Sequence, residues 1–193
     1  MKKEETNSSN KKKAHCESSG SYLRENEMLF DADTVTAGEY LSVVRTQFLR
    51  EGTIRYAESF FDAKEAAKVA GKLLEHADRE MFLVLSLDAR NKALALEVAA
   101  IGTIDRCIVG VAEIFRHALL SCAVSIICFH NHPSGKCYAS LSDQKVTERI
   151  EQAGEILGIP LLDHIILGAG GSYYSMAEQG QIKGRSGSDW NLR

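Results

Sequence analysis

Nearly continuous apolar runs, separated by polar segments, predict the strands of this chain. The runs that predict buried strands are MFLVLSL (81–87), AVSIICF (123–129) and LLDHIIL (161–167). ALALEVA (93–99) follows the first run across the turn-like stretch DARN, so the two are predicted to form a hairpin. Shorter strands are predicted at 53–61, 104–109 and 172–176, with GAGG (168–171) as the hairpin connection before the last of them.

Apolar residues three and four positions apart predict helices between these strands, at 63–76, 111–122 and 142–157. Asp62 is expected to cap the first helix, and Leu119 and Cys122 of the second are expected to face inward. Gly158 and Pro160 are expected to stop the third. Helices that alternate with strands, together with two hairpins, predict an α/β fold of the α+β type with a mixed β-sheet flanked by helices.

One domain, over residues 53–180, is predicted within the 193-residue chain. Residues 1–27 are rich in Lys, Glu, Ser and Asn and predict a disordered polar tail. Apolar residues recur at helical spacing over 28–52, which predicts a short helical arm. Residues 181–193 are expected to form a C-terminal tail.

Composition narrows the classes of function. The net charge is −3 and the sequence pI is about 6.1, which argues against a general nucleic-acid-binding surface, and the cluster Lys11 to Lys13 is interpreted as solvated charge. No apolar run reaches the roughly 18 residues of a membrane span, so no membrane partner is expected. The five cysteines form no CxxC pair, which indicates reduced thiols in a cytoplasmic protein.

The stretch HNHPSGKCYASLSD (130–143) carries the candidate chemistry. His130 and His132 are two residues apart at the end of a predicted strand, so their side chains point the same way, about 7 Å apart, and can share a metal ion. Pro133 ends the strand and a turn follows, so the chain can fold back and bring Asp143 as a third ligand. Two histidines and one carboxylate leave the fourth position of a tetrahedral zinc to water, as in catalytic sites.

The same letters have a structural interpretation. Ser140 and Asp143 have the spacing of a capping box, in which Asp143 only satisfies a helix start. The two interpretations are compatible, because a capped helix start would fix the position of Asp143. Cys137 is interpreted as a bystander in the loop, and Asp163 and His164 as residues that satisfy local hydrogen bonds.

The spacing His-x-His, seven residues, Ser, two residues, Asp resembles the JAMM (MPN-type) metalloprotease motif, and HNHPSG with S-x-x-D resembles the RadC family in particular. ESFFDAKEAAKVAGKLL, REMFLVLSLDARN, EIFRHAL and LGIPLLDHIILG agree with that family too, so the similarity covers about residues 53–180. The resemblance implies a JAMM/MPN (cytidine deaminase-like) architecture. It also implies a zinc-dependent hydrolase that cleaves a peptide or isopeptide bond of a protein or peptide substrate.

The resemblance also implies roles for individual residues. His130, His132 and Asp143 match the zinc ligands. Ser140 matches the serine that helps to orient the attacking water and to polarise the scissile carbonyl. Glu80 is the candidate general base, with Glu97 and then Glu113 as alternatives; their sequence positions leave this choice open.

Two departures from the RadC pattern bear on function. RadC-like sequences usually carry Pro-Arg-Glu where this chain has Val111-Ala112-Glu113. Full-length members usually also bear an N-terminal helix-hairpin-helix-like region, and residues 1–52 show no Gly-centred hairpin signature for it. The alternatives to a peptidase are an accessory protein of DNA repair or recombination and a metal-dependent nuclease. The missing N-terminal signature and the acidic pI make a nucleic-acid partner the weaker expectation, and the oligomeric state is left open.

Overall fold

The structure of this protein is a computed structural model, and it describes residues 52–54, 56, 59–60, 62–74, 77–102, 109–183 and 190. The predicted polar tail (1–27) and nearly all of the predicted arm (28–52) lie outside the described residues. Residues 104–108 of the strand predicted at 104–109 and most of the predicted C-terminal tail lie outside them too.

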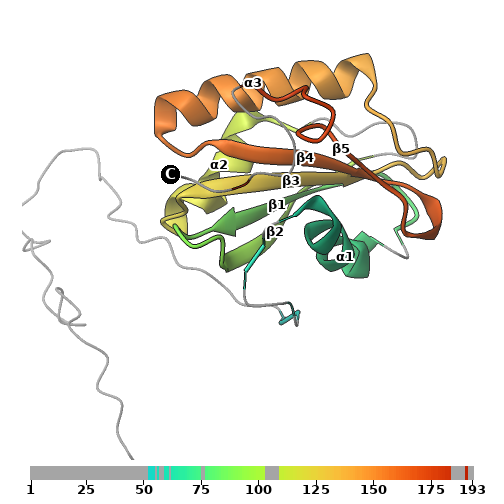
Figure 1. The fold of residues 1–193 in the computed structure, drawn as a ribbon, viewed down its shortest axis with the longest axis horizontal. Helices are drawn as coiled ribbons and strands as arrows, with labels where there is room; N and C mark the ends of the chain where they lie inside the picture. The colour runs from blue at the N-terminus through green and yellow to red at the C-terminus, as the bar shows by residue number, and fades with distance from the viewer. Residues whose placement is uncertain are drawn as a thin grey trace, which may run out of the picture. The chain divides into compact units, whose positions relative to one another are not determined.

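The described residues form a five-stranded mixed sheet in the order β2-β1-β3-β4-β5 (Figure 1). The strands are β1 (Met81–Leu87), β2 (Ala93–Ile101), β3 (Ser125–Asn131), β4 (Leu161–Leu167) and β5 (Tyr173–Ser175). Strand β1 pairs antiparallel with β2 and β3, β4 pairs antiparallel with β5, and β3 and β4 are parallel. The predicted mixed sheet and both predicted hairpins are confirmed.

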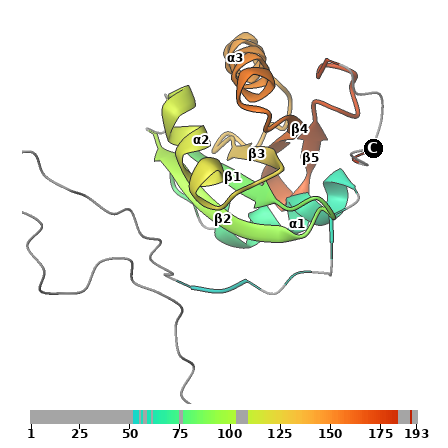
Figure 2. The same cartoon turned by 90° about the vertical axis from the view of Figure 1, so that its left-hand side faces the viewer.

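Three α-helices of the described residues cover the two faces of the sheet: α1 (Ala63–Leu74), α2 (Val111–Leu120) and α3 (Leu141–Leu157). Figure 2 shows α1 on one face and α2 and α3 on the other. Side chains of α1 and Trp190 pack on one set of strand residues, including Leu83, Ile127 and Ile165. Side chains of α2 and α3 pack on the alternate set, including Val84 and Cys128. This alternation follows from the two-residue period of a strand.

Two predictions about the elements are wrong. Residues 53, 54, 56, 59 and 60 do not form the strand predicted at 53–61. Phe60 is buried, but its N–H makes a single bond to the Asn91 carbonyl, so it fills the core from a loop. The second helix ends at Leu120, and Cys122 adopts φ 53°, so Leu119 and Cys122 are exposed instead of facing inward.

Other boundaries follow their predicted signals. Asp62 accepts a hydrogen bond from the Glu65 N–H at 2.8 Å, which confirms it as the cap of α1. Gly158 ends α3 in the left-handed conformation, with φ 70°. A three-residue turn of 3-10 helix, η2 (Ala169–Gly171), joins β4 to β5. None of the described helices is long and apolar enough to cross a membrane.

Candidate metal centre

The register of β1 and β3 positions two of the candidate residues. Phe82 of β1 lies opposite His130 of β3, and both side chains face α2 and α3. Continuing this antiparallel register by two residues sets Glu80 opposite His132. Their side chains then project from the same face, because both lie two residues from the Phe82–His130 pair. Two sequence segments some fifty residues apart therefore converge here.

Asn131, the last residue of β3, fixes the backbone on both sides of Glu80. Its side-chain amide donates to the Arg79 carbonyl at 3.0 Å, and its side-chain oxygen accepts from the Met81 N–H at 2.8 Å. The Asn131 side chain is 7% exposed, so few water molecules compete for these bonds. Glu80 itself is 9% exposed. Its backbone is therefore held where its carboxylate can face the histidines.

The start of α3 positions Asp143. Ser140 is the N-cap, its hydroxyl accepts from the Asp143 N–H at 3.2 Å, and the Asp143 Oδ2 accepts from the Ser140 N–H at 2.7 Å. The predicted capping box is confirmed. These two bonds set the orientation of the Asp143 carboxylate, whose Oδ1 is then directed toward His130.

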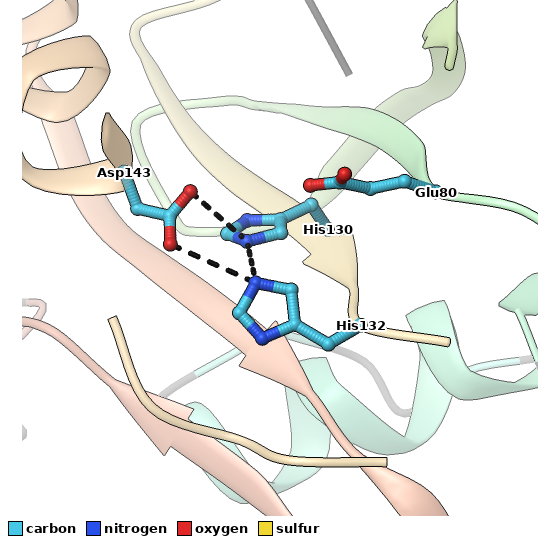
Figure 3. A group of neighbouring side chains, drawn as sticks. All are labelled: Glu80, His130, His132 and Asp143. Atoms are coloured by element: carbon cyan, nitrogen blue, oxygen red, sulfur yellow. Dashed lines mark hydrogen bonds and ion pairs between the residues drawn. The ribbon is translucent and has the colours of Figure 1, made fainter. Parts of the chain in front are cut away.

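Glu80, His130, His132 and Asp143 each offer a ligand atom, and these atoms lie within 4.8 Å of one another. The His130 Nε2 is 2.9 Å from the His132 Nε2 and 3.4 Å from the Asp143 Oδ1, and the His132 Nε2 is 3.7 Å from the Asp143 Oδ2. Figure 3 shows the Glu80 carboxylate on the far side of the imidazoles from Asp143. The group can bind a metal ion.

The centre is sealed on one side and open on the other. The His130 side chain is only 2% exposed, whereas those of His132 and Asp143 are 19% and 14% exposed. The side of His132 and Asp143 is therefore the one that solvent reaches.

Electrostatics keep the Asp143 carboxylate ionised. Burial alone would raise its pKa, but the neighbouring imidazoles of His130 and His132 outweigh burial and hold the pKa well below its ordinary value. The neighbouring Asp143 carboxylate raises the pKa of His132, although burial opposes it. Deeper in the protein, burial and then the neighbouring His130 lower the pKa of His164 well below its ordinary value.

The donor set fits zinc. The Nδ1 of His132 lies 2.8 Å from the Lys136 carbonyl and must donate to it, so the Nε2 of a neutral His132 carries a lone pair. A carboxylate and imidazole nitrogens are common ligands of zinc, and a metal-binding histidine is normally oriented by the hydrogen bond that its second ring N–H donates.

Other candidates lie outside this group of four. Glu97 lies on β2, opposite Val84 of β1. Glu113 lies in the first turn of α2, and its carboxylate is 3.5 Å from the Arg116 guanidinium. Cys137 is a free, half-buried thiol and is not in the group.

Sequence reasoning missed three residues around the centre. Asn131 holds the segment of Glu80, and His164 and Thr147 form a buried chain of hydrogen bonds behind His130. The sequence interpretation gives His164 only a local hydrogen bond, whereas its partner His130 lies on a strand 34 residues away. A polar residue in the apolar run LLDHIIL is the signal that the sequence offers.

A family model described as the RadC-like JAB domain matches residues 60–181. The chain belongs to this family. The mixed sheet with its helices agrees with a JAB/MPN domain, as expected from the resemblance.

Curated relatives agree with this assignment. A UPF0758 protein of Histophilus somni (strain 2336) is 40% identical over 129 residues, which are 67% of this chain and 58% of that protein. A UPF0758 protein of Methanosarcina mazei is 43% identical over 105 residues, 54% of this chain and 45% of that protein. A third, of Actinobacillus pleuropneumoniae serotype 5b (strain L20), is 35% identical over 163 residues, 78% of this chain and 74% of that protein. The chain spans about half the length of the first two. None of the three names states an activity.

Proposed function

We propose that this protein is a zinc-dependent hydrolase of the JAMM type that cleaves a peptide or isopeptide bond. The observation that carries the proposal is the convergence of one buried imidazole, one accessible imidazole and two carboxylates within 4.8 Å. Membership of the RadC-like JAB domain family supports the same reaction class.

His130, His132 and Asp143 would hold the zinc ion. When bound, zinc supplies Lewis acidity, which lowers the pKa of a water molecule at its open position and polarises a carbonyl oxygen. Asp143 contributes a negative charge that balances the ion. The Lys136 carbonyl keeps the His132 ring oriented for this task, since it accepts from Nδ1 at 2.8 Å.

Glu80 would act as the general base. Its carboxylate belongs to the group of four and lies on the far side of the imidazoles from Asp143 (Figure 3). A carboxylate in that place can accept a proton from the attacking water and return it to the leaving amine. The Asn131 bonds to the backbone at Arg79 and Met81 hold Glu80 in position for both transfers.

Ser140 would polarise the scissile carbonyl. Its oxygen is committed to the Asp143 N–H of the capping box, but a hydroxyl can donate one hydrogen bond while it accepts another. Its hydrogen either bonds to the Ser142 hydroxyl, 3.1 Å away, or turns to a substrate oxygen. A donor aimed at the developing oxyanion stabilises the transition state.

The proposal is tested with zinc-loaded wild type and Glu80→Gln on three substrate panels: peptides, isopeptide-linked conjugates, and single-stranded and branched DNA. We expect wild type to cleave a member of the first two panels. Glu80→Gln should retain zinc but lose activity by about 100-fold or more. Metal-dependent cleavage of DNA alone would instead support a nuclease. Salt-dependent DNA binding without cleavage, indifferent to Glu80→Gln, would support an accessory role in repair or recombination.

A further inference from the structure

A buried chain of hydrogen bonds runs from His130 away from the candidate metal centre. The His130 Nδ1 is 2.9 Å from the His164 Nε2, and the His164 Nδ1 is 2.7 Å from the Thr147 Oγ1. The Thr147 hydroxyl is in turn 2.7 Å from the Asp143 carbonyl oxygen. Exposure of the three side chains is 1–2%. These hydrogen bonds thus link β3, β4 and α3, and the last of them ends at the backbone of Asp143, the proposed acidic ligand.

The hydrogen bond between Thr147 and the Asp143 carbonyl determines which atom donates in each of the other bonds of this chain. A carbonyl oxygen can only accept, so the Thr147 hydroxyl must donate to the Asp143 carbonyl. The opposite direction would leave these two oxygens 2.7 Å apart with no hydrogen between them. The Met176 Sδ, 3.3 Å from the same hydroxyl, is also only an acceptor. With either acceptor, the Thr147 oxygen is left with lone pairs for His164.

His164 must then donate from Nδ1 to Thr147. Its two ring hydrogen bonds go to a hydroxyl and an imidazole, and neither partner carries a charge that would favour a buried imidazolium. A neutral His164 protonated at Nδ1 has a lone pair at Nε2, and that lone pair faces His130. The His130 Nδ1 therefore donates the next hydrogen bond, and its Nε2 is left unprotonated.

We propose that Thr147 and His164 are positioning residues that fix His130 in its Nδ1–H tautomer, with the Nε2 lone pair directed at Asp143 and His132. This inference rests on the proposed function only in that the lone pair would serve a metal ion. A metal-binding histidine usually donates its second N–H to a carboxylate or a carbonyl. Here the acceptor is the neutral imidazole of His164, and the tautomer of His164 depends in turn on the Thr147 hydroxyl, one helical turn after Asp143.

Thr147→Val tests this dependence with little change of shape. Valine gives His164 no acceptor at Nδ1, so the buried ring is expected to move its proton to Nε2. His164 then donates to His130, whose proton moves to Nε2 and blocks the lone pair. Thr147→Ser keeps the hydroxyl and is the matched control.

Two-bond ¹H–¹⁵N correlation spectra of the metal-free protein report which ring nitrogen carries the proton. At about pH 8.5 we expect His130 to carry this proton on Nδ1 in wild type and Thr147→Ser. In Thr147→Val it should move to Nε2. His132 is an internal reference for Nδ1, because its Nδ1–H donates to the Lys136 carbonyl and should keep its proton throughout. The His130 Nε2 lone pair lies 2.9 Å from the His132 Nε2, so in the metal-free wild type the His132 Nε2 must carry a proton as well, beside the Asp143 carboxylate. An Nδ1–H His130 in Thr147→Val, or loss of the His132 Nδ1 proton, would overturn the inference.

Competition titrations with zinc give the second readout. Loss of such an orienting partner commonly weakens metal binding by about 10- to 100-fold, so Thr147→Val should show that loss and Thr147→Ser should not. Equal zinc affinities for the two variants would overturn the inference. If wild type binds no zinc, the proposed function fails, and the spectra alone still decide the tautomer.

His164 offers a second matched pair should Thr147→Val fail to fold. His164→Gln can place an amide oxygen near the position of Nε2, whereas His164→Met fills the space without a comparable acceptor. We expect zinc affinity to be largely kept in the first variant and reduced about 10- to 100-fold in the second. Equal affinities would overturn the inference.

Discussion

Asn131→Ala should weaken both the fold and the candidate metal centre. The Asn131 side chain donates to the Arg79 carbonyl at 3.0 Å and accepts from the Met81 N–H at 2.8 Å. The substitution removes both bonds and leaves the segment that carries Glu80 held only by its neighbours. The Glu80 carbonyl still accepts from the Gly102 N–H at 2.7 Å, so the segment should loosen without unfolding.

The expected loss of stability follows from these two bonds. Each intramolecular hydrogen bond contributes about 1 kcal/mol net, and the site is 7% exposed, so the free energy of unfolding should fall by about 2 kcal/mol. For a domain of this size that corresponds to a decrease of roughly 4–8 °C in Tm. Under the proposed function, misplacement of the base should also lower kcat about 10- to 100-fold.

Urea unfolding followed by circular dichroism measures the stability, and initial rates on a cleaved substrate measure kcat. Gln152→Ala is the matched control, since it removes a side-chain amide from an exposed position of α3. An Asn131→Ala protein as stable as wild type would refute the account of the two bonds. Loss of stability with unchanged kcat would refute the claim that Asn131 positions Glu80.

Other consequences concern a buried acid, a tight loop and the metal. Burial raises the pKa of Asp163 to about 6, despite hydrogen bonds from Ser175 and Ala177. The folded protein therefore binds this proton more tightly than the unfolded chain, and the free energy of unfolding should fall by up to roughly 3 kcal/mol as pH rises from about 4 through 6. Unfolding free energies measured across that range should show the decline in wild type and a flatter profile in Asp163→Asn. A Cβ at Gly168 would lie 2.6 Å from the Ser172 Oγ and 2.7 Å from the Gly135 carbonyl oxygen, so Gly168→Ala should cost about 1–3 kcal/mol in urea unfolding. Free zinc at 100 times its Kd should stabilise the fold by about 2.7 kcal/mol, seen as a rise in Tm that EDTA reverses, and an unchanged Tm would contradict zinc binding.

Much of the fold could be predicted because the apolar pattern of each segment matches its burial in the folded protein. The strands of the centre of the sheet are apolar on both faces, so MFLVLSL and LLDHIIL indicated β1 and β4 with correct bounds. The segment TIRYAESFF (53–61) is rich in the β-branched and aromatic residues typical of strands, but Phe60 enters the core from a loop, and composition cannot distinguish that from a strand. Strand β3 extends to Asn131 because its parallel pairing with β4 continues there, a non-local fact.

The residues of the candidate centre also differ in whether local sequence is enough to predict them. His130, His132 and Asp143 lie within 14 residues, so their spacing allows a shared metal site, and the family resemblance favours it over a helix cap alone. The family resemblance indicates Glu80, and the β1–β3 register explains why it lies in the group of four. Asn131 and His164 could not be found in the same way. Their partners are 50 and 34 residues away, and only the pairing of strands brings them together.

The most direct test of the account is the zinc content of the purified protein, measured by mass spectrometry of the metal in wild type and His132→Ala. His132 is the most exposed of the three proposed ligands, so its removal should disturb the core least. We expect about one zinc ion per chain in wild type and almost none in the variant. Full retention of zinc by His132→Ala would contradict the proposed metal centre.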